Sequence, residues 1–409
     1  MTAGGGAGRL CLVARFGDGL AIDADLVRAA EAAAIEARTP LGGTNPDLAC
    51  VFVYGADPDQ VGEALQRAAS VVRARTVIGC SASGVIGGSR GVEATTAVSV
   101  WAAVLPGVRI RAFHLEVIRT PNGMAVLGLP AIDEVDQVAV VLADPFSFPA
   151  DGFVEQANEA MGIPLVGGMA MGARGPGSTR LLLDSRPVDR GAVGVVLGGP
   201  VGARATVSQG CRPVGPPMTV TAAEGNLLLE LAGMPAIRKL EQVLSALPSE
   251  DQALASAGLQ IGVAMDEYAE EHERGDFLVR GILGLDQGRG GVAVGDVVGV
   301  GRTVRFQVRD AASADDDLRE MVKRVREEFL TVEGALLFSC NGRGSNLFTS
   351  ADHDVLAMRQ GLSTSGIGGF FAAGEIGPVG GRNHLHGFSA SVLVFGTPRQ
   401  PVASVRSDR

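Results

Sequence analysis

A nine-residue pattern, G-x-x-A-x-G-x-x-G, occurs three times in this chain and constrains its fold more than any other feature. The copies occupy residues 79–87, 167–175 and 369–377. Four fixed positions in each of three copies exceed what chance would give, even in a chain where 58 of 409 residues are glycine. Internal repetition of this kind indicates a fold assembled from copies of one structural unit.

The residues around each copy support this, because the expected elements follow in one order: strand, helix, strand, glycine loop, strand. In the first unit the apolar run 48–54 predicts a buried strand, and Asp57 followed by Pro58 predicts the start of a helix. Residues 76–78 and 96–104 are the other two expected strands. In the second unit the expected strands are 137–142, 164–166 and 192–197, with a helix capped by Asp151 after the first. In the third unit the expected strands are 334–338 and 389–395, with a helix capped by Ser350 between them. We therefore expect an α/β fold of mixed β-sheets flanked by helices, built from duplicated β-α-β-Gly loop-β units.

The region between the second and third copies has a different pattern. Residues 224–244 are expected to form a helix, and residues 314–329 a charged amphipathic helix. The expected strands of this region, most of them alternating as in an antiparallel sheet, are 259–265, 277–285, 292–300 and 303–309.

The length of the chain predicts two domains, because 409 residues exceed what one hydrophobic core usually serves. The passage 210–217 is rich in glycine and proline, and the expected boundary follows it, near residue 230. The predicted domains are therefore residues 1–230 and 231–409.

Charge and cysteine content narrow the class of partner. The formal net charge is −10 and no stripe of basic residues is present, which argues against nucleic acid as the main partner. The five cysteines form no C-x-x-C pair, so neither a disulfide framework nor a thiolate zinc site is indicated. The start of the chain does not have the layout of a signal peptide, and no run approaches the ~20 apolar residues of a membrane span. We expect a cytoplasmic protein without a membrane partner; its oligomeric state is left open.

Five short motifs lie between residues 78 and 387, and the similarity that they carry runs over roughly residues 45–396, nearly the whole chain. In the C-terminal half they are LLFSCNGRG at 336–344, GFFAAGEIG at 369–377 and NHLHG at 383–387; in the N-terminal half they are IGCS at 78–81 and GCRPVG at 210–215. With these motifs the chain resembles the FIST family, a two-part sensory module of bacterial signalling proteins and of some eukaryotic F-box proteins.

The resemblance implies a FIST N-terminal-like domain followed by a FIST C-terminal-like domain. Family members are thought to bind small ligands, with amino acids proposed, and some bacterial members are described as haem-containing nitric oxide sensors. Many members carry a kinase, methyl-acceptor or cyclase domain, and this chain does not. The resemblance therefore implies a sensor whose output passes through a separate signalling protein.

The loop of residues 340–344 is the first candidate site. It follows an expected strand and precedes a helix, where α/β proteins place ligands. Backbone N–H groups between two glycines can form an anion nest, and an arginine can fork onto a carboxylate, so an amino-acid carboxylate would suit the loop. The plainer alternative is a tight turn with a surface arginine. The candidate ligand-binding residues of the loop are Cys340, Asn341, Arg343 and Gly344.

The second candidate segment begins at Glu375, which lies among apolar and glycine neighbours, where a carboxylate needs a partner or solvent. It could hold a ligand ammonium, or it could cap backbone amides or pair with Arg382. His384 and His386 would face one side of an extended chain, and one of them could be an axial haem ligand. Histidines of this kind are more often hydrogen-bonded within the fold, and two ligands do not complete a zinc site. With Asn383 these residues complete the segment.

Two further groups are open to a functional and a structural interpretation. Cys340 with His386 is the one pair that resembles a cysteine nucleophile and its base, although a buried cysteine that acts as a small apolar residue is the commoner case. Cys80 and Ser81, the first-copy counterparts of Phe370 and Phe371, could line a pocket.

These observations lead us to expect a cytoplasmic small-ligand sensor with no catalytic residues and no metal ligands, and an amino acid or related metabolite as its ligand. Three alternatives stay open: a haem-binding nitric oxide sensor, a thiol-dependent hydrolase that uses Cys340 and His386, and a protein–protein scaffold.

Overall fold

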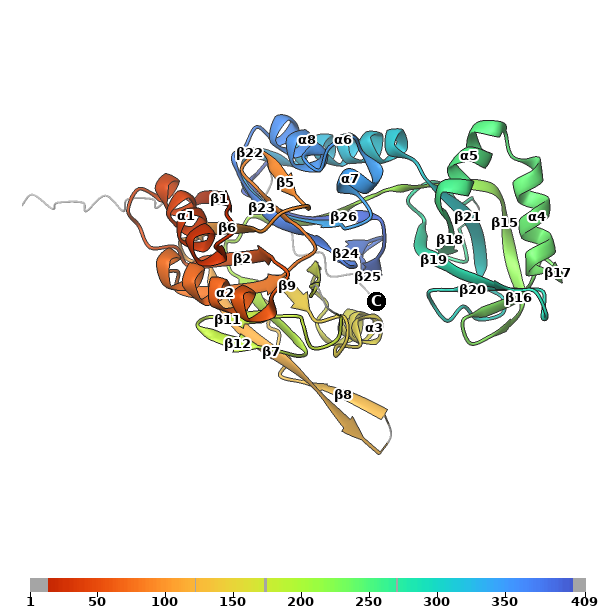
Figure 1. Cartoon of the computed structure of the whole chain (residues 1–409), viewed down its shortest axis with the longest axis horizontal. Helices are drawn as coiled ribbons and strands as arrows, with labels where there is room; N and C mark the ends of the chain where they lie inside the picture. The colour runs from red at the N-terminus through yellow and green to blue at the C-terminus, as the bar shows by residue number, and fades with distance from the viewer. Residues whose placement is uncertain (1–13, 122, 173–174, 270, 400–409) are drawn as a thin grey trace, which may run out of the picture.

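Three mixed β-sheets with the same arrangement of strands form the main body of the protein (Figure 1). The computed structural model describes residues 14–121, 123–172, 175–269 and 271–399. At the centre of each sheet two parallel strands of one unit lie side by side: β2 (Leu48–Tyr54) with β3 (Thr76–Ser81), β9 (Asp136–Ala143) with β10 (Leu165–Met169), and β22 (Phe329–Cys340) with β23 (Gly366–Ala372).

Antiparallel strands extend each sheet on the side of its first central strand. The closing strands of the three units are β6 (Ala97–Val104), β13 (Ala192–Gly198) and β26 (Ser389–Pro398). Beyond them lie β1 (Arg15–Ile22), β7 (Arg109–Thr120) with β8 (Gly123–Leu127), and β14 (Ala203–Gln209). The mixed α/β fold and its three repeated units are thus confirmed.

At the end of each glycine pattern, or shortly after it, the chain forms a β-hairpin that joins the sheet of a different unit. The hairpin of the first unit pairs with β23, that of the second with β3, and that of the third with β10. These hairpins are β4 (Val85–Gly87) with β5 (Arg90–Val92), β11 (Leu181–Leu183) with β12 (Arg186–Val188), and β24 (Glu375–Val379) with β25 (Arg382–His386). Each unit therefore completes the sheet of a neighbour, in a closed cycle that the sequence pattern did not reveal.

The first glycine of each pattern is required by close contact with the parallel strand beside it. A Cβ atom there would lie 2.7, 2.0 or 1.8 Å from a backbone oxygen, closer than real Cβ contacts allow. The glycines and their carbonyl partners are Gly79 with Val51, Gly167 with Val141, and Gly369 with Leu337. Residues 173–174 of the second copy lie outside the described residues.

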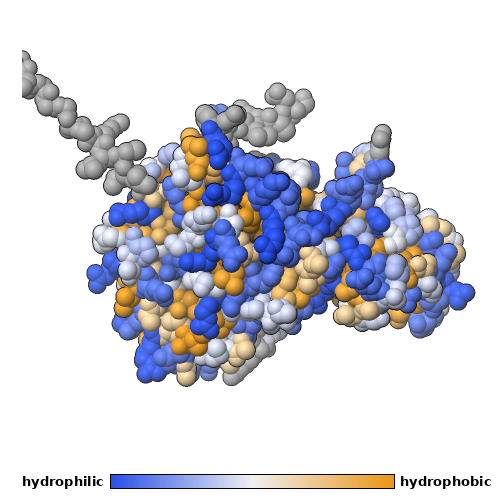
Figure 2. All heavy atoms as spheres, turned by 90° about the horizontal axis from the view of Figure 1, so that it is seen from above, coloured by the Kyte–Doolittle hydropathy of each residue, from blue (hydrophilic) through white to orange (hydrophobic). Residues whose placement is uncertain are grey.

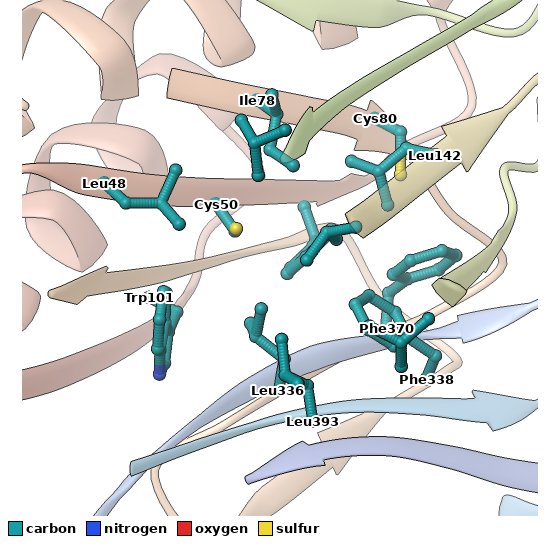
Figure 3. Close-up of a cluster of buried hydrophobic side chains, with 14 of the residues drawn as sticks. Leu48, Cys50, Ile78, Cys80, Trp101, Leu142, Leu336, Phe338, Phe370 and Leu393 are labelled. Carbon is teal, nitrogen blue, oxygen red and sulfur yellow. The ribbon is translucent and has the colours of Figure 1, made fainter. Parts of the chain in front are cut away.

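The inner faces of the three sheets share one hydrophobic core (Figure 3). Phe52 of the first unit packs against Phe338 and Phe370 of the third, with ring centroids 6.3 and 4.9 Å away. The indole N–H of Trp101 donates a hydrogen bond of 3.1 Å to the Gly366 carbonyl across the same junction. The units are therefore bound together by side-chain packing as well as by exchanged strands.

Helices cover the outer face of each sheet. They are α1 (Leu26–Arg38), η1 (Thr39–Leu41) and α2 (Pro58–Val72) in the first unit, α3 (Ala150–Ala160) in the second, and α6 (Ala311–Glu328), α7 (Gly344–Leu347) and α8 (His353–Leu362) in the third. Asp57 is the predicted N-cap of α2, and its carboxylate accepts from two backbone N–H groups. The other two predicted caps are wrong. Asp151 lies inside the first turn of α3, and Ser350 bonds the Asp352 N–H before α8 begins.

Residues 211–309 form a separate lobe with its own seven-stranded sheet (Figure 2). The strands are β15 (Cys211–Glu224), β16 (Leu227–Leu231), β17 (Met234–Pro235), β18 (Leu259–Ala264), β19 (Phe277–Asp286), β20 (Gly291–Val294) and β21 (Thr303–Arg309). Helices α4 (Ala236–Ala246) and α5 (Ser249–Gly258) pack on one face of this sheet. The helix predicted over 224–244 is wrong in its first half, because β16 pairs with β15 and β20 there.

The lobe is inserted between two elements of the main body, since β14 precedes it and α6 follows it. The predicted division of the sequence near residue 230 stays a prediction. No helix among the described residues is long and apolar enough to cross a membrane.

Candidate functional site

The third unit brings three of the predicted residues together in its interior. Cys340 ends β22, Arg343 precedes α7, and Glu375 begins β24. Arg343 and Glu375 are fully buried, and Cys340 is 5% exposed. Because Glu375 belongs to the hairpin that β10 holds, the sheet of the second unit fixes its position beside the loop of the third.

Arg343 forks onto a carboxylate of the chain itself. Its Nε and Nη2 atoms donate to the Asp354 carboxylate at 2.8 and 2.9 Å, and Asp354 also accepts from Ser339 Oγ at 2.8 Å. Burial alone would raise the pKa of Asp354, but the Arg343 charge and hydrogen bonds from His353, Arg343 and Ser339 hold it far below the ordinary value. Arg343 Nη1 has no protein partner.

A carboxylate of the chain lies just after the predicted anion nest, whose Gly342 and Arg343 N–H groups bond Cys340 instead. The Ser345 N–H and Oγ donate to Glu93, just after β5, at 2.9 and 2.7 Å. Gly344 has a φ of +48°, and a Cβ there would lie 2.6 Å from that carboxylate. Asn341 is half-buried and forms backbone hydrogen bonds with Ala372 and with the Asn346 side chain. The turn is therefore held against the exchanged hairpin of the first unit.

The Cys340 thiol is surrounded by backbone amides and a carboxyl group. Its Sγ accepts from the N–H groups of Gly342 and Phe388 at 3.4 and 3.2 Å. Phe388 has a φ of +61°, a conformation that costs a bulky residue free energy and that often marks a functional site. Burial, followed by the charge of Glu375, raises the pKa of Cys340 well above its ordinary value. The sulfur is therefore a neutral thiol at neutral pH.

Only one of the two carboxyl oxygens of Glu375 has a hydrogen-bond partner. Its Oε2 accepts from the Ser389 N–H at 3.0 Å, and its Oε1 has no partner. Burial raises the pKa of Glu375 well above its ordinary value, although the Ser389 N–H, the Cys340 thiol and the Arg343 charge act in the opposite direction. Its surroundings therefore favour the protonated form of the acid more strongly than water does.

The remaining residues of the predicted segment lie in β25. Arg382 is exposed. Asn383 is buried and holds the hairpin to the second unit, because its side chain accepts from Leu165 N–H at 2.7 Å and donates to the Ile163 carbonyl at 3.0 Å. This asparagine has a structural role in the fold.

The two histidines are neutral at neutral pH, and His386 is bonded within the fold. Burial lowers the pKa of His386 to about 3 and that of His384 to about 4. His386 Nε2 lies 3.0 Å from the Gly377 carbonyl, so this nitrogen has a partner in the protein. The described residues contain no group of three or more His, Cys, Asp or Glu placed to hold a metal ion.

Cys80 and Ser81 lie elsewhere, on β3. Cys80 points into the common core (Figure 3). Ser81 Oγ accepts from the Arg180 N–H at 3.0 Å. No hydrogen bond in the described part of the chain joins either residue to the Cys340 group, nor Cys340 to His386.

Sequence reasoning missed the partners of the predicted residues. Asp354 lies in the helix that follows the 340–344 loop. Glu93 is far from the loop in sequence, and so is Arg309, whose Nη2 donates to the Gly342 carbonyl. A weak signal existed for Asp354, because an arginine in a buried loop requires an acid, and Asp354 lies in the first turn of the next helix. Nothing in the sequence indicated Glu93 or Arg309.

Comparison with known proteins matches this chain to a FIST N domain over residues 47–234 and to a FIST C domain over residues 236–378. The uncharacterized protein Rv0628c of Mycobacterium tuberculosis is 42% identical over 93% of this chain and 99% of its own length. The uncharacterized protein Mb0898c of Mycobacterium bovis is 40% identical over 93% of this chain and 98% of its own length.

Proposed function

Because this chain belongs to the FIST family, whose domains are associated with signal-transduction sensors, we propose that it is a cytoplasmic sensor of an amino acid or related zwitterionic metabolite. Its ligand binds at the group formed by Cys340, Arg343 and Glu375. The output passes to a separate signalling protein.

One observation supports this proposal above the others: two buried polar atoms of opposite character lack a partner. Arg343 Nη1 is a donor, and Glu375 Oε1 belongs to an ionisable carboxyl group. A buried polar atom without a partner costs roughly 1–3 kcal/mol, so such atoms need a ligand or water. A carboxylate suits the arginine, and an ammonium group suits the ionised glutamate.

The charges around the site concern mainly the ammonium end of the ligand. Asp354 already balances the charge of Arg343, so Arg343 Nη1 offers a hydrogen bond and no uncompensated charge. The ionised form of Glu375 matches one ammonium group. The carboxylate of an α-amino acid can accept from Arg343 Nη1 while its ammonium group pairs with Glu375.

The thiol-hydrolase alternative has less support. The neighbour of Cys340 is a carboxyl group, and the pKa of the thiol is raised, whereas a nucleophilic cysteine needs a lowered pKa. We propose no catalytic step.

The test is a thermal-shift screen of the full chain with L-amino acids, followed by calorimetry on each compound that raises the melting temperature. Glu375→Gln keeps the shape of the protonated acid but cannot ionise, so it should fold normally and lose the ligand-induced shift. Glu63→Gln, on the exposed face of α2, is the matched control and should keep it. If no amino acid raises the melting temperature, or if Glu375→Gln responds as the wild type does, the proposal fails.

A further inference from the structure

Buried polar atoms without a partner gather where the inserted lobe meets the main body. Eight such side-chain atoms occur among the described residues. Five of them belong to two groups, one on each side of this junction. They are Gln260 Oε1, Gln307 Nε2 and Arg309 Nε on the lobe, and Arg343 Nη1 and Glu375 Oε1 on the main body.

The three lobe residues share one face of the lobe sheet. Gln307 and Arg309 are two residues apart on β21, so they point the same way, roughly 7 Å apart. Gln260 lies directly opposite Gln307 on β18. The alternate residues, among them Phe306 and Val308, pack under α4 and α5 on the other face. The two glutamines therefore occupy the face that the lobe's own helices leave free.

The main body covers that face. Arg309 Nη2 donates to the carbonyls of Gly342 and Asn346 at 2.5 and 2.8 Å, and its guanidinium carbon lies 5.3 Å from the centre of the Phe388 ring. Gly342 and Phe388 are the residues whose N–H groups reach Cys340 Sγ. Arg309 thus connects the glutamine pair on the lobe to the Cys340 group.

The Gln260 and Gln307 side chains present one free acceptor and one free donor. They are 8% and 2% exposed, so bulk water does not satisfy them. An acceptor and a donor on directly paired residues are complementary to a carboxamide, which carries an N–H and a C=O on the same edge. A carboxylate in its place would put a second acceptor against Gln260 Oε1, which disfavours it.

We propose that the ligand site extends across this junction and that Gln260 and Gln307 bind a carboxamide group of the ligand. The ligand is then an amino acid with an amide side chain, of the glutamine or asparagine type. This inference rests on the proposed function, because Arg343 and Glu375 supply the other half of the site.

The connection between lobe and body permits the ligand to enter. The chain crosses between them twice, through Gly210 after β14 and through Asp310 before α6. The two crossings are neighbours, because Cys211 pairs with Arg309. Figure 1 shows the lobe beside the main body. Rotation about this double crossing would break the Arg309 and Arg280 bonds to the main body and separate the glutamines from the Cys340 loop, and a ligand that contacts both walls favours the closed arrangement.

The experiment is calorimetric titration of the full chain with L-glutamine, L-asparagine, L-glutamate, L-aspartate and L-alanine. A site built to hydrogen-bond a carboxamide should bind the better amide at least tenfold more tightly than the matching acid. Gln307→Leu should weaken binding of the amide at least tenfold and leave L-alanine binding unchanged. Without ligand, Gln307→Leu should unfold at the wild-type temperature or above, because it removes a buried polar atom that has no partner.

Gln242→Leu, on the exposed side of α4, is the matched control and should bind as the wild type does. Failure of both amides to bind, equal affinity for amide and acid, or an unchanged amide affinity in Gln307→Leu would each overturn the carboxamide subsite. Amino-acid binding that depends on Glu375 but not on Gln307 would leave the proposed function standing and remove this inference alone.

Discussion

Ionising Glu375 places a negative charge on a fully buried carboxyl group, so the folded chain binds its proton more tightly than the unfolded chain does. Above the unfolded pKa, about 4.3, the unfolded state therefore holds fewer protons than the folded state. The sign follows directly: this residue makes the protein less stable as pH rises from there toward the raised folded pKa.

Glu375→Gln removes that titration and should give a stability difference that depends on pH. Near pH 4 the variant and the wild type should unfold at similar denaturant concentrations. At pH 7 the variant should be the more stable, and the gap should widen by up to about 1.4 kcal/mol per pH unit below the folded pKa. Urea unfolding at pH 4, 5, 6 and 7 measures the gap; a constant difference would mean that Glu375 is ionised in the fold.

Ligand binding should release the same proton of Glu375. An ammonium group binds the ionised form, so each binding event releases a proton, and affinity for an amino acid should rise about tenfold per pH unit below the raised pKa. Calorimetry at one pH in two buffers of different ionisation enthalpy counts the protons. Glu375→Gln should release none, and proton uptake by the wild type would contradict the assigned role.

Cys340 supports a reactivity prediction at the same scale. Its thiol is buried and its pKa is raised, so maleimide labelling of the native protein at pH 7 should be at least a hundred times slower than labelling in urea. Mass spectrometry of the Cys340 peptide measures both rates. Fast stoichiometric labelling of the native protein would instead favour the thiol-dependent hydrolase.

At the scale of elements, the central strands could be predicted and the exchanged hairpins could not. The run 48–54 is continuous and apolar, and it forms β2 with the predicted bounds. The strands β4 and β11 are three residues long, and their partners belong to another unit, so no local pattern marks them. Leu227–Leu231 lay inside an expected helix because its apolar content fits either structure, and only pairing with β15 and β20 makes it a strand.

The candidate site, too, has residues that the sequence could predict and residues that it could not. Cys340, Arg343 and Glu375 could be found because they lie in distinctive motifs. Glu93 comes from the first unit and Arg309 from the lobe, and Asp354 comes from a later helix of the loop's own unit, so their proximity to the loop depends on tertiary structure. Glu93 reaches the loop only because the first unit gives its hairpin to the third.

Gly369→Ala tests the close contact between strands. The new Cβ would meet the Leu337 backbone oxygen at 1.8 Å, so β22 and β23 would have to separate along the centre of their sheet. We expect a loss of about 3 kcal/mol or more in the free energy of unfolding, measured with urea. Gly284→Ala, where nothing lies within 4 Å, is the control and should change stability by less than about 1 kcal/mol. A mild effect at Gly369 would show that the strands can move apart freely.

At the scale of the whole molecule, the first and third units depend on each other, whereas the lobe can be separated. The main body closes its sheets with strands that are far apart in the sequence, because β14 pairs with β26 and β4 pairs with β23. The lobe has its own core and leaves the main body where Cys211 and Arg309 are paired.

Replacing residues 212–308 with a short glycine-serine turn should therefore leave a main body that unfolds in one cooperative transition. A fragment of residues 1–230 should be insoluble or bind a hydrophobic dye, because it exposes the inner core and lacks β22, β23 and β26. Circular dichroism during heating and dye fluorescence compare the two. A fragment 1–230 that folds cooperatively would support the domain division expected from the sequence.

The closed cycle of exchanged hairpins resembles a homotrimer in which each subunit gives a hairpin to the next, except that here the three units belong to one polypeptide. In a true trimer every subunit must carry the same residue at each position. Here the three equivalent places at the end of the first central strand hold Tyr54, Asp144 and Cys340, a phenol, a carboxylate and a thiol. A single polypeptide is free of that symmetry, so each of the three places can hold a different chemical group while the same exchange of hairpins closes the ring.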